Sequence, residues 1–342
     1  MSPKNLSVIK KNHKILKNKL KINKISQLYK KFEKNFSLKT NFVVAVSGGP
    51  DSLALAFCAM IYSIKNNLKP KFFIVDHKLR MESTKEAKVV KKLLKKYSID
   101  VEILTWRGKK PSNNLSSLAR MKRYELLFEK CDEYKINNIL LGHHQDDLLE
   151  NFFIRILRGS GLNGLVSLDK KTKIGNKNLL RPLLHEKKEN LKFLSMKVFN
   201  FYVKDPSNED EKFQRIRIRK LIQELEINGL DKKKFLKTIK NLKNSNNTAN
   251  HYVGENLNKN SFFSGKSNKL ILNKVFFEQP QEIVFRTLSE VIKLVGKKYY
   301  SVRGKKIDKI INSIKNEDSF QGTLGGCIIK KVNQTVIISK EY

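Results

Sequence analysis

The sequence predicts an α/β fold, a doubly wound and mostly parallel sheet followed by a smaller C-terminal α+β module. Three observations support this. Residues 42–46 are uncharged and mostly β-branched or aromatic, which is typical of a strand buried on both faces of a parallel sheet. Similar short strands alternate with segments of helical periodicity up to about residue 225. Beyond Asn228-Gly229-Leu230 the pattern changes to a polar helical stretch, short strands and a hairpin.

The composition points to a polyanionic partner. The chain has 342 residues, enough for about two domains, and 70 Lys and Arg against 32 Asp and Glu. A net charge of +38 attracts nucleic acid first and an acidic membrane surface second. Because the lysines are spread evenly along the chain, they define no particular binding face. The charge therefore supports an RNA partner without establishing one.

The cysteines and the apolar runs indicate a cytoplasmic protein. The three cysteines are widely separated and form no CxxC pair, which argues against a zinc ribbon or an iron–sulfur cluster and fits a reducing compartment. The longest apolar run, 53–62, is far too short to span a bilayer. We therefore expect no membrane partner.

Residues 1–40 are a basic N-terminal extension. We expect the first two dozen residues to be disordered and residues 25–36 to form an amphipathic helix. The strand 42–46 then leads into Ser47-Gly48-Gly49-Pro50-Asp51-Ser52 and an apolar helix. The glycine pair allows a sharp turn and close approach of a ligand, and a proline is tolerated at a helix start.

Strand, glycine turn and helix start together predict a phosphate cradle. Asp51 and Ser52 fall in the first helical turn, where free amides and the positive end of the helix dipole attract anions. No Gly-Lys-Ser/Thr follows, so this is not the common P-loop, and it is not a GxGxxG turn either. Ser-Gly-Gly-x-Asp-Ser resembles the pyrophosphate loop (PP-loop) of the N-type ATP pyrophosphatases, which split ATP into AMP and pyrophosphate while adenylating a substrate. A tight turn rich in serine and glycine is the simpler alternative.

A second strand, 71–76, ends in Asp76-His77-Lys78-Leu79-Arg80, and Ser83 and Glu86 have the spacing of a capping box. The further elements expected in this domain are a helix to about residue 97, a strand at 101–106, a helix at 114–135 and a strand at 137–141. Arg120 and Arg123 lie three residues apart on the 114–135 helix, so they project from one surface. A solvated basic face would explain this pair equally well.

The strand 137–141 leads into Gly142-His143-His144-Gln145-Asp146-Asp147. A helix starting near Asp146 places Asp146, Asp147 and Glu150 on one side of its first turns. Helix capping accounts for the two aspartates, but not for Glu150 or for two histidines at a strand end. Clustered carboxylates suit a cationic substrate or Mg²⁺, and a nucleotide-bound Mg²⁺ fits better than a protein-held zinc.

The rest of the chain is expected to be mostly helical, with a turn at 205–208. Arg215, Arg217 and Arg219 fan around one helix, which suits a phosphate backbone, a nucleotide or simply solvent. The later elements expected are helices at 187–201, 231–257, 280–296 and 303–315, a strand at 269–273 and a hairpin of 324–330 with 335–340. We therefore predict three parts: an N-terminal extension at 1–40, a catalytic domain at 41–225 and a C-terminal module at 226–342.

A series of motifs in one order resembles the tRNA(Ile)-lysidine synthase family from about Asn41 to Ser339. After the PP-loop, the matching stretches are Val75 to Arg80, Ala119 to Tyr124, Gly142 to Glu150, Arg158 to Leu165, Arg181 to Leu183, Asp205 to Asn208, Phe213 to Arg219 and Thr323 to Cys327. The PP-loop alone indicates only the superfamily, and the HHxDD block with Arg-Gly-Ser-Gly-Leu makes the resemblance specific. Two positions depart from the family pattern: Lys78 stands for a usual glycine and Ile216 for a usual asparagine.

The resemblance implies an adenine nucleotide alpha hydrolase-like fold and an ATP-dependent ligase. Such enzymes join free L-lysine to C2 of the wobble cytidine of a CAU-anticodon tRNA(Ile), through an adenylated cytidine. ATP and Mg²⁺ are the implied cofactors, and the C-terminal module would bind the tRNA body. No stable protein partner is implied, and a homodimer stays open.

The resemblance also implies roles for individual residues. The residues implied to be catalytic are Asp51, Asp146, Asp147, Glu150 and His143. Those implied to bind ATP are Ser47, Gly48, Gly49, Pro50, Asp51, Ser52, His77 and Arg80, with Asp51 as the Mg²⁺ ligand. Those implied to bind tRNA are Arg120, Arg123, Arg215, Arg217 and Arg219.

Three other functions share part of this pattern. A tRNA thiolation enzyme shares the ATP-cleaving loop but generally needs a catalytic cysteine or a cluster-binding set, and Cys58, Cys131 and Cys327 are not placed for either. An NAD or GMP synthetase would not call for this charge or for the distal module. A non-catalytic RNA-binding protein would gain nothing from carboxylates that repel phosphates. Lysidine synthesis is the function that the sequence favours.

Overall fold

The structure is a computed structural model that describes residues 3–108, 115–204, 211–264, 269–297, 302 and 304–341. The chain divides into two compact units, Met1–Leu236 and Lys237–Tyr342. The division falls in the first turns of helix α10 (Lys232–Asn260), so helix α9 (Gln214–Ile227) belongs wholly to the first unit. The turn expected at 205–208 lies outside the described residues.

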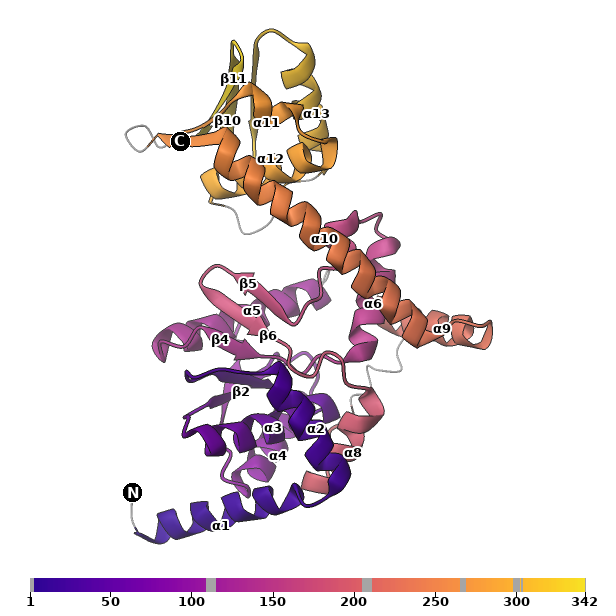
Figure 1. Ribbon diagram of the computed structural model, residues 1–342. Helices are drawn as coiled ribbons and strands as arrows, with labels where there is room; N and C mark the ends of the chain where they lie inside the picture. The colour runs from indigo at the N-terminus through magenta and orange to yellow at the C-terminus, as the bar shows by residue number, and fades with distance from the viewer. Residues whose placement is uncertain are drawn as a thin grey trace. The chain divides into compact units, whose positions relative to one another are not determined.

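The first unit is built on a six-stranded sheet in the order β3-β2-β1-β4-β6-β5 (Figure 1). Its strands are β1 (Val43–Val46), β2 (Lys71–Asp76), β3 (Val101–Thr105), β4 (Asn138–Leu140), β5 (Lys171–Ile174) and β6 (Lys177–Leu180). All neighbours pair in parallel except β5 and β6, which form an antiparallel hairpin at one edge. The predicted mostly parallel sheet is confirmed. The hairpin was not predicted, because β5 is short and carries two lysines.

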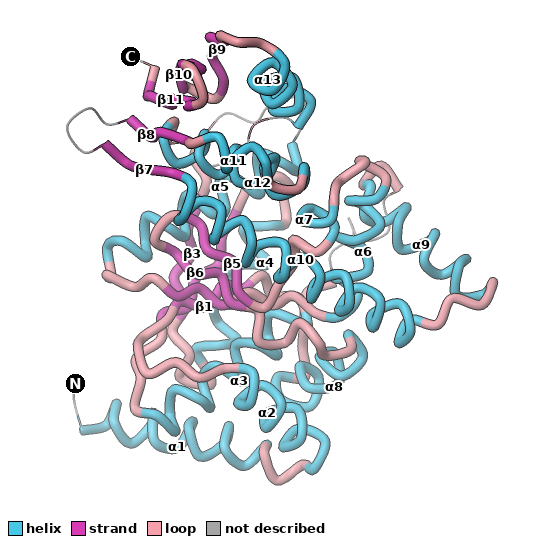
Figure 2. Tube along the Cα trace, turned by 45° about the horizontal axis from the view of Figure 1, so that its top comes forward, coloured by secondary structure: helices cyan, strands magenta, loops and turns pink. Residues whose placement is uncertain are grey.

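Helices cover both faces of this sheet, as a doubly wound fold requires (Figure 2). The remaining helices of the unit are α1 (Pro3–Lys19), α2 (Asn23–Asn35), α3 (Pro50–Asn66), α4 (Ser83–Lys95), α5 (Leu115–Glu133), α6 (Gln145–Ile156), α7 (Leu162–Leu165) and α8 (Lys188–Phe199). Because successive side chains of a strand point to opposite faces, Val44 and Val46 join the core formed with α3, α4 and α8, whereas Val43 joins the core formed with α5.

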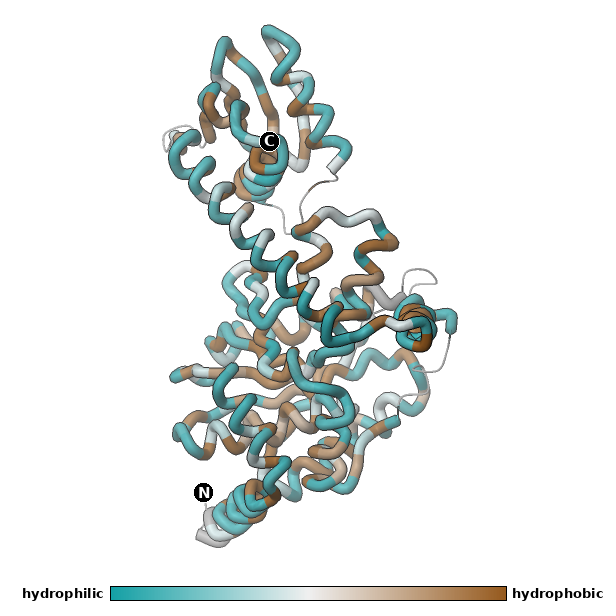
Figure 3. The backbone as a smooth tube through the Cα atoms, turned by 45° about the vertical axis from the view of Figure 1, so that its right-hand side comes forward, coloured by the Kyte–Doolittle hydropathy of each residue, from teal (hydrophilic) through white to brown (hydrophobic). Residues whose placement is uncertain are grey.

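The N-terminal extension is folded onto this unit. Leu16 of α1 and Ile25, Tyr29 and Phe32 of α2 are buried in the same core as α3. Asn12 donates to Ser98 Oγ at 3.0 Å, which fixes α1 beside the turn that follows α4. Disorder over the first two dozen residues is therefore wrong for residues 3–24, although Figure 3 shows that α1 is hydrophilic along most of its length.

The second unit is an α+β module around an antiparallel sheet in the order β7-β8-β11-β10-β9. Its strands are β7 (Ser261–Ser264), β8 (Lys269–Leu272), β9 (Phe320–Leu324), β10 (Cys327–Val332) and β11 (Thr335–Lys340), and its shorter helices are α11 (Lys274–Glu278), α12 (Gln281–Val295) and α13 (Gly304–Asn316). The expected hairpin of β10 and β11 is confirmed. Strand β7 lies between the expected helix at 231–257 and the expected strand at 269–273, where we predicted no element.

Candidate active site

The PP-loop leaves the carboxyl end of β1, the strand between β2 and β4. Gly48 has a left-handed φ of 84°, and a Cβ there would lie 2.6 Å from Val90 Cγ2 and 2.9 Å from Val203 Cγ2. Only glycine fits this position. Its carbonyl accepts from the backbone N–H of Val203 at 2.9 Å, which ties the loop to the chain that follows α8.

Ser52 holds the loop closed from inside. Its hydroxyl accepts from the backbone N–H of Ser47 at 3.1 Å and donates to the carbonyl of Gly49 at 3.0 Å. The Ser47 hydroxyl donates to Ser52 Oγ at 3.2 Å. Helix α3 begins at Pro50 with Gly49 as N-cap, and the N-cap residue supplies no side-chain hydrogen bond to the first turn. The start of this helix is therefore suited to an anion.

The second half of the site follows β4, and Gly142 brings it against α3. A Cβ on Gly142 would lie 3.1 Å from the backbone of Asp51 and Ser52. His144 then caps α6. Its ring Nδ1 accepts from the backbone N–H of Asp146 at 3.2 Å, and the backbone N–H of His144 donates to Asp147 Oδ2 at 2.9 Å. Both halves of the site therefore meet at the carboxyl ends of neighbouring parallel strands, the usual ligand position in such sheets.

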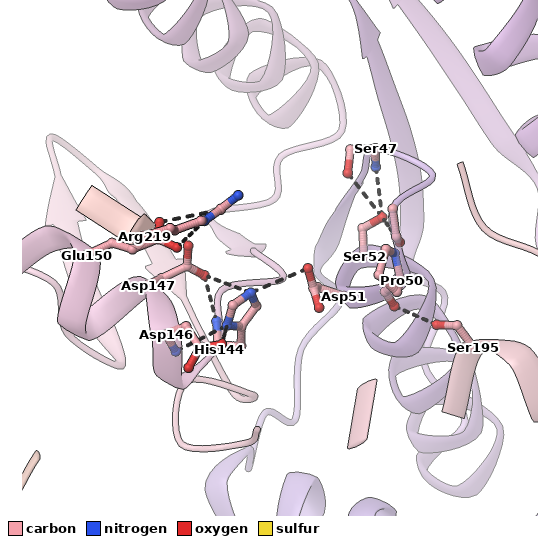
Figure 4. Close-up of polar contacts among 11 residues, drawn as sticks. Ser47, Pro50, Asp51, Ser52, His144, Asp146, Asp147, Glu150, Ser195 and Arg219 are labelled. Carbon is pink, nitrogen blue, oxygen red and sulfur yellow. Dashed lines mark hydrogen bonds and ion pairs between the residues drawn. The ribbon is translucent and has the colours of Figure 1, made fainter. Parts of the chain in front are cut away.

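Figure 4 shows His144 between the carboxylates of the two halves. Its Nε2 lies 3.5 Å from Asp51 Oδ2 and 3.7 Å from Asp147 Oδ2. Burial raises the pKa of Asp51, and the charge of Asp147 raises it further, against the opposing effects of His144 and Lys188. Burial would also raise the pKa of Asp147, but His144, His143 and the backbone N–H of His144 outweigh it and hold that pKa below its ordinary value. The two carboxylates thus differ in their readiness to ionise.

The three carboxylates of α6 have different surroundings. Glu150 is only 1% exposed and pairs with Arg219 of α9, with 2.5 Å from Nε to Oε1 and 3.5 Å from Nη2 to Oε2. Asp147 is mostly buried beside His144, and Asp146 has the most exposed side chain of the three, at 33%. Glu150 is thus paired with an arginine of the protein, whereas Asp147 points toward His144 and the PP-loop side of the site (Figure 4).

His143 is surrounded by arginines. Arg181, which the sequence analysis did not include among the site residues, is 4% exposed and donates from Nε to His143 Nδ1 at 3.2 Å. Burial lowers the pKa of His143 to about 3, and the charges of Arg181, Arg215 and Arg120 add to the effect against that of Asp147. His143 is therefore neutral at physiological pH. The signal for Arg181 was a lone arginine directly after an apolar strand and before Pro182.

The end of β2 forms the other flank. Asp76 accepts from the Lys78 backbone N–H at 2.9 Å, from Ser83 Oγ at 2.7 Å and from Thr84 Oγ1 at 2.6 Å. Lys78 has a left-handed φ of 50°, which explains why glycine is usual at this position. The expected capping box is wrong, because Ser83 binds Asp76 and Glu86 pairs with Arg80 at 2.8 Å.

His77 is held between Arg123 and Trp106. Arg123 Nε donates to His77 Nε2 at 3.3 Å, and the Trp106 ring lies edge-on with its centroid 6.5 Å away. Since Nε2 accepts, Nδ1 carries the hydrogen, and this buried Nδ1 has no partner in the described residues. Burial, with the charge of Arg123, lowers the pKa of His77 to about 4. His77 thus offers a donor that no described residue satisfies, directly after the carboxyl end of β2.

The five arginines expected to bind tRNA are divided among several tasks. Arg219 pairs with Glu150, Arg123 with His77, and Arg217 donates to the carbonyls of Glu211 and Lys212 at 2.6 and 3.2 Å. The Arg120 guanidinium lies 5.6 Å from the centre of the Tyr124 ring. The charge of Arg215 lowers the pKa of His143 and of Asp147. Ile216, the second departure from the family pattern, is 7% exposed in the face of α9 that packs inward.

The two neutral histidines make stability depend on pH. An unfolded histidine takes up a proton as the pH falls through about 6.5, whereas His77 and His143 stay neutral down to about 4 and about 3 in the folded protein. The unfolded chain therefore binds more protons in this window, and stability falls as the pH drops below about 6.5. Urea unfolding followed by Trp106 fluorescence at a series of pH values measures this.

Replacing His77 and His143 together with glutamine should flatten that slope between pH 4 and 6.5. The control is His251→Gln, because His251 is exposed on α10 in the other unit. A slope that is the same in the double variant and in the control would contradict the assignment.

Neither cysteine chemistry nor a resident metal is indicated by the described residues. Burial raises the pKa of the Cys58 thiol, and it raises that of Cys131 to about 11; Cys327 is also buried. No group of three or more histidine, cysteine or acidic residues in the described ranges could hold a metal ion by itself. Among the described helices, none has the length and apolar character that a membrane crossing requires.

Comparison with known proteins shows the family of this chain. The family model described as the PP-loop domain matches residues 18–225. The chain is 30% identical to tRNA(Ile)-lysidine synthase of Wolbachia sp. subsp. Brugia malayi over 93% of this chain and 74% of that protein. It is 32% identical to the protein of the same name from Orientia tsutsugamushi, over 91% of this chain and 71% of that one.

A solved structure supports the fold alone. The U34-tRNA thiolase NcsA from Methanococcus maripaludis, described with its 4Fe-4S cluster, aligns with a TM-score of 0.56 at 18% identity, over 64% of this chain and 78% of that one. Its likeness shows the shared PP-loop architecture, while the sequence relatives match across both units. With Gly48 at the turn, the open start of α3 and the carboxylates of α6 in place, the chain belongs to the PP-loop domain family and, within it, to the tRNA(Ile)-lysidine synthases.

Proposed function

We propose that this enzyme joins the ε-amine of free L-lysine to C2 of the wobble cytidine of a CAU-anticodon tRNA(Ile), consuming ATP and releasing AMP and pyrophosphate. One observation carries the proposal. Asp51, in the first turn of the helix that follows the PP-loop, and Asp147, a carboxylate suited to an ammonium group, both have an oxygen within 3.7 Å of His144 Nε2. A two-step ligation needs a phosphate site and an amine site this close together.

In the first step the C2 oxygen of the cytidine attacks the α-phosphorus of ATP. A bond forms between that oxygen and phosphorus, the bond to the β-phosphate oxygen breaks, and pyrophosphate leaves. The amides at the start of α3 and of the Gly48–Gly49 turn would hold the negative charge of the leaving group. Ser52 serves indirectly here, because its hydroxyl is used to keep the loop closed. His77 Nδ1, a buried donor to which no described residue is bound, would bind an acceptor atom of the nucleotide.

Asp51 fits the role of a Mg²⁺ ligand. Its Oδ1 is a buried acceptor without a partner among the described residues, which a cation would satisfy. Mg²⁺ is commonly held by one or two carboxylates together with substrate phosphates, so a nucleotide-borne ion needs no larger carboxylate cluster of the protein. When bound, the ion would neutralise charge on the phosphate oxygens.

In the second step the lysine amine attacks C2, the C2–O bond to the adenylate breaks, and AMP leaves. The ammonium group must first be bound and lose a proton, tasks that we assign to Asp147 with Asp146. Glu150 acts through Arg219, which it holds beside the site. His143 is neutral and bound at Nδ1 by Arg181, so its Nε2–H can donate to the cytidine or to the phosphate of the adenylate.

The arginines near His143 and the second unit would bind the RNA. Arg120, Arg123 and Arg215 would contact phosphates near the reacting nucleotide, and the α+β module would bind the tRNA body. Phosphate contacts position the RNA without reading its sequence. Preference for one tRNA therefore rests on contacts beyond these arginines.

Asp147→Ala is expected to separate the two steps. Loss of the amine-binding carboxylate should slow lysine transfer by about 10²- to 10⁴-fold, while RNA-dependent release of pyrophosphate continues. Rapid-quench measurement of pyrophosphate and of lysine-modified RNA in one experiment separates the rates. Equal loss in both would contradict the division of roles between Asp51 and Asp147.

The proposal is tested by the products of ATP cleavage. The purified enzyme should convert ATP to AMP and pyrophosphate only when an unmodified CAU-anticodon tRNA(Ile) transcript is present, and turnover should require lysine. Cleavage to ADP and phosphate, or cleavage that ignores RNA, would refute it. RNA-dependent AMP formation without any need for lysine would favour a different nucleophile.

A further inference from the structure

His144 links the two halves of the site, a role that its place in the sequence does not reveal. Its side chain is buried, with 3% of the residue exposed. Nδ1 accepts from the backbone N–H of Asp146, so the ring hydrogen is on Nε2. That hydrogen faces two acceptors, Asp51 Oδ2 at 3.5 Å and Asp147 Oδ2 at 3.7 Å (Figure 4).

Both distances exceed those of a formed hydrogen bond, which are about 2.7–3.2 Å between nitrogen and oxygen. The ring N–H therefore lies between two carboxylates and forms a short hydrogen bond with neither. The two acceptors sit on different elements, Asp51 on α3 after β1 and Asp147 on α6 after β4. A small shift of either carboxylate would complete one of the two bonds.

We propose that His144 is a positioning residue that couples the adenylation step to the lysine-transfer step, through the geometry in which its Nε2–H lies between Asp51 and Asp147. This inference rests on the proposed function. When the nucleotide engages Asp51, the Nε2–H bonds to Asp147 and fixes the orientation of its carboxylate for the incoming amine. The chain thereby aligns the amine site only when the phosphate site is filled.

Two variants separate this role from helix capping. His144→Asn keeps an oxygen that can accept from the N–H of Asp146, since asparagine is among the best N-caps, but it removes the donor at the Nε2 position. His144→Gln does the opposite, because its longer amide can place N–H groups near the two carboxylates while it caps poorly. We expect His144→Asn to unfold at the wild-type urea concentration and to lose about 10- to 100-fold in the rate of lysine transfer.

His144→Gln is expected to be less stable than His144→Asn but faster in lysine transfer. This comparison tests the proposal even if His144→Asn proves unstable. Lysine transfer that is faster in the more stable of the two variants, whether or not that variant keeps the N–H donor, would overturn the proposal. Nucleotide binding, read from the fluorescence of the single tryptophan Trp106, confirms that each variant retains its fold.

A double-mutant cycle gives the decisive readout. If His144 acts through Asp147, His144→Asn should slow transfer in the wild-type background but add nothing in the Asp147→Asn background, in single-turnover reactions with preformed adenylated RNA. A merely structural role would give the same fold-loss in both backgrounds and would overturn the proposal. So would a His144→Asn enzyme with wild-type transfer. An inactive wild-type enzyme would instead refute the proposed function, so the two failures are distinguishable.

Discussion

Asp51→Ala is expected to abolish adenylation, lowering RNA-dependent pyrophosphate release by about 10²- to 10³-fold or more. Asp51 is the acidic residue in the first turn of α3, where the PP-loop amides converge, and it presents a buried Oδ1 without a partner among the described residues. Removing it takes away the proposed Mg²⁺ ligand and one of the two carboxylates that face His144. Pre-steady-state release of pyrophosphate measures the effect.

The control for this prediction is Asp100→Ala, an exposed aspartate of the same unit. It should leave the rate unchanged. Trp106 fluorescence should also show how Asp51→Ala changes the affinity for ATP. We expect the loss of affinity relative to the wild type to be larger with Mg²⁺ than without it. An Asp51→Ala enzyme that releases pyrophosphate at the wild-type rate would contradict the placement of the phosphate site at α3.

Arg219→Met is expected to cost the first unit about 3–5 kcal/mol of unfolding free energy. Glu150 is 1% exposed, and Arg219 is its ion-pair partner at 2.5 Å. Without that partner a carboxylate stays buried and uncompensated, or must take up a proton, and either costs stability. Because the chain has one tryptophan and it lies in the first unit, urea unfolding followed by its fluorescence reports this unit alone.

The double variant Glu150→Gln with Arg219→Met should recover much of that loss, because the buried charge is removed together with its partner. Arg217→Met, on the same helix, serves as the matched control, because within the described ranges the Arg217 side chain binds the carbonyls of Glu211 and Lys212 and no buried carboxylate. It should change stability by less than about 1 kcal/mol. If Arg219→Met and the double variant are equally unstable, the stabilising role of Arg219 is something other than neutralising Glu150.

The parallel sheet, the PP-loop and the carboxylate cluster could be predicted because each depends on residues that are close together in the sequence. The stretch 42–46, the Gly48–Gly49 pair and the spacing from Asp146 to Glu150 are short patterns with direct physical meaning. What could not be predicted depends on partners distant in the chain. From the sequence, Glu150 is expected to be a free carboxylate, but in the structure Arg219 of α9 pairs with it. Ser83 is expected to cap a helix, but its hydroxyl donates to Asp76 instead.

The N-terminal residues show the same limit. A lysine-rich stretch such as 3–19 looks disordered by composition, and only its packing reveals a helix, through Leu16 in the core and Asn12 on Ser98. Likewise, His143 and His144 look equivalent in sequence. The structure separates them, with His143 among arginines and His144 between two carboxylates.

The most direct test of the central claim is incorporation of radiolabelled lysine into tRNA. The enzyme, ATP and Mg²⁺ are incubated with an unmodified CAU-anticodon isoleucine tRNA transcript, and a methionine tRNA with the same anticodon is the control. We predict that lysine enters only the isoleucine tRNA, that Asp51→Ala abolishes the product and that Asp147→Ala slows its formation by about 10²- to 10⁴-fold. ATP cleavage that depends on RNA without any lysine in either tRNA would contradict the account.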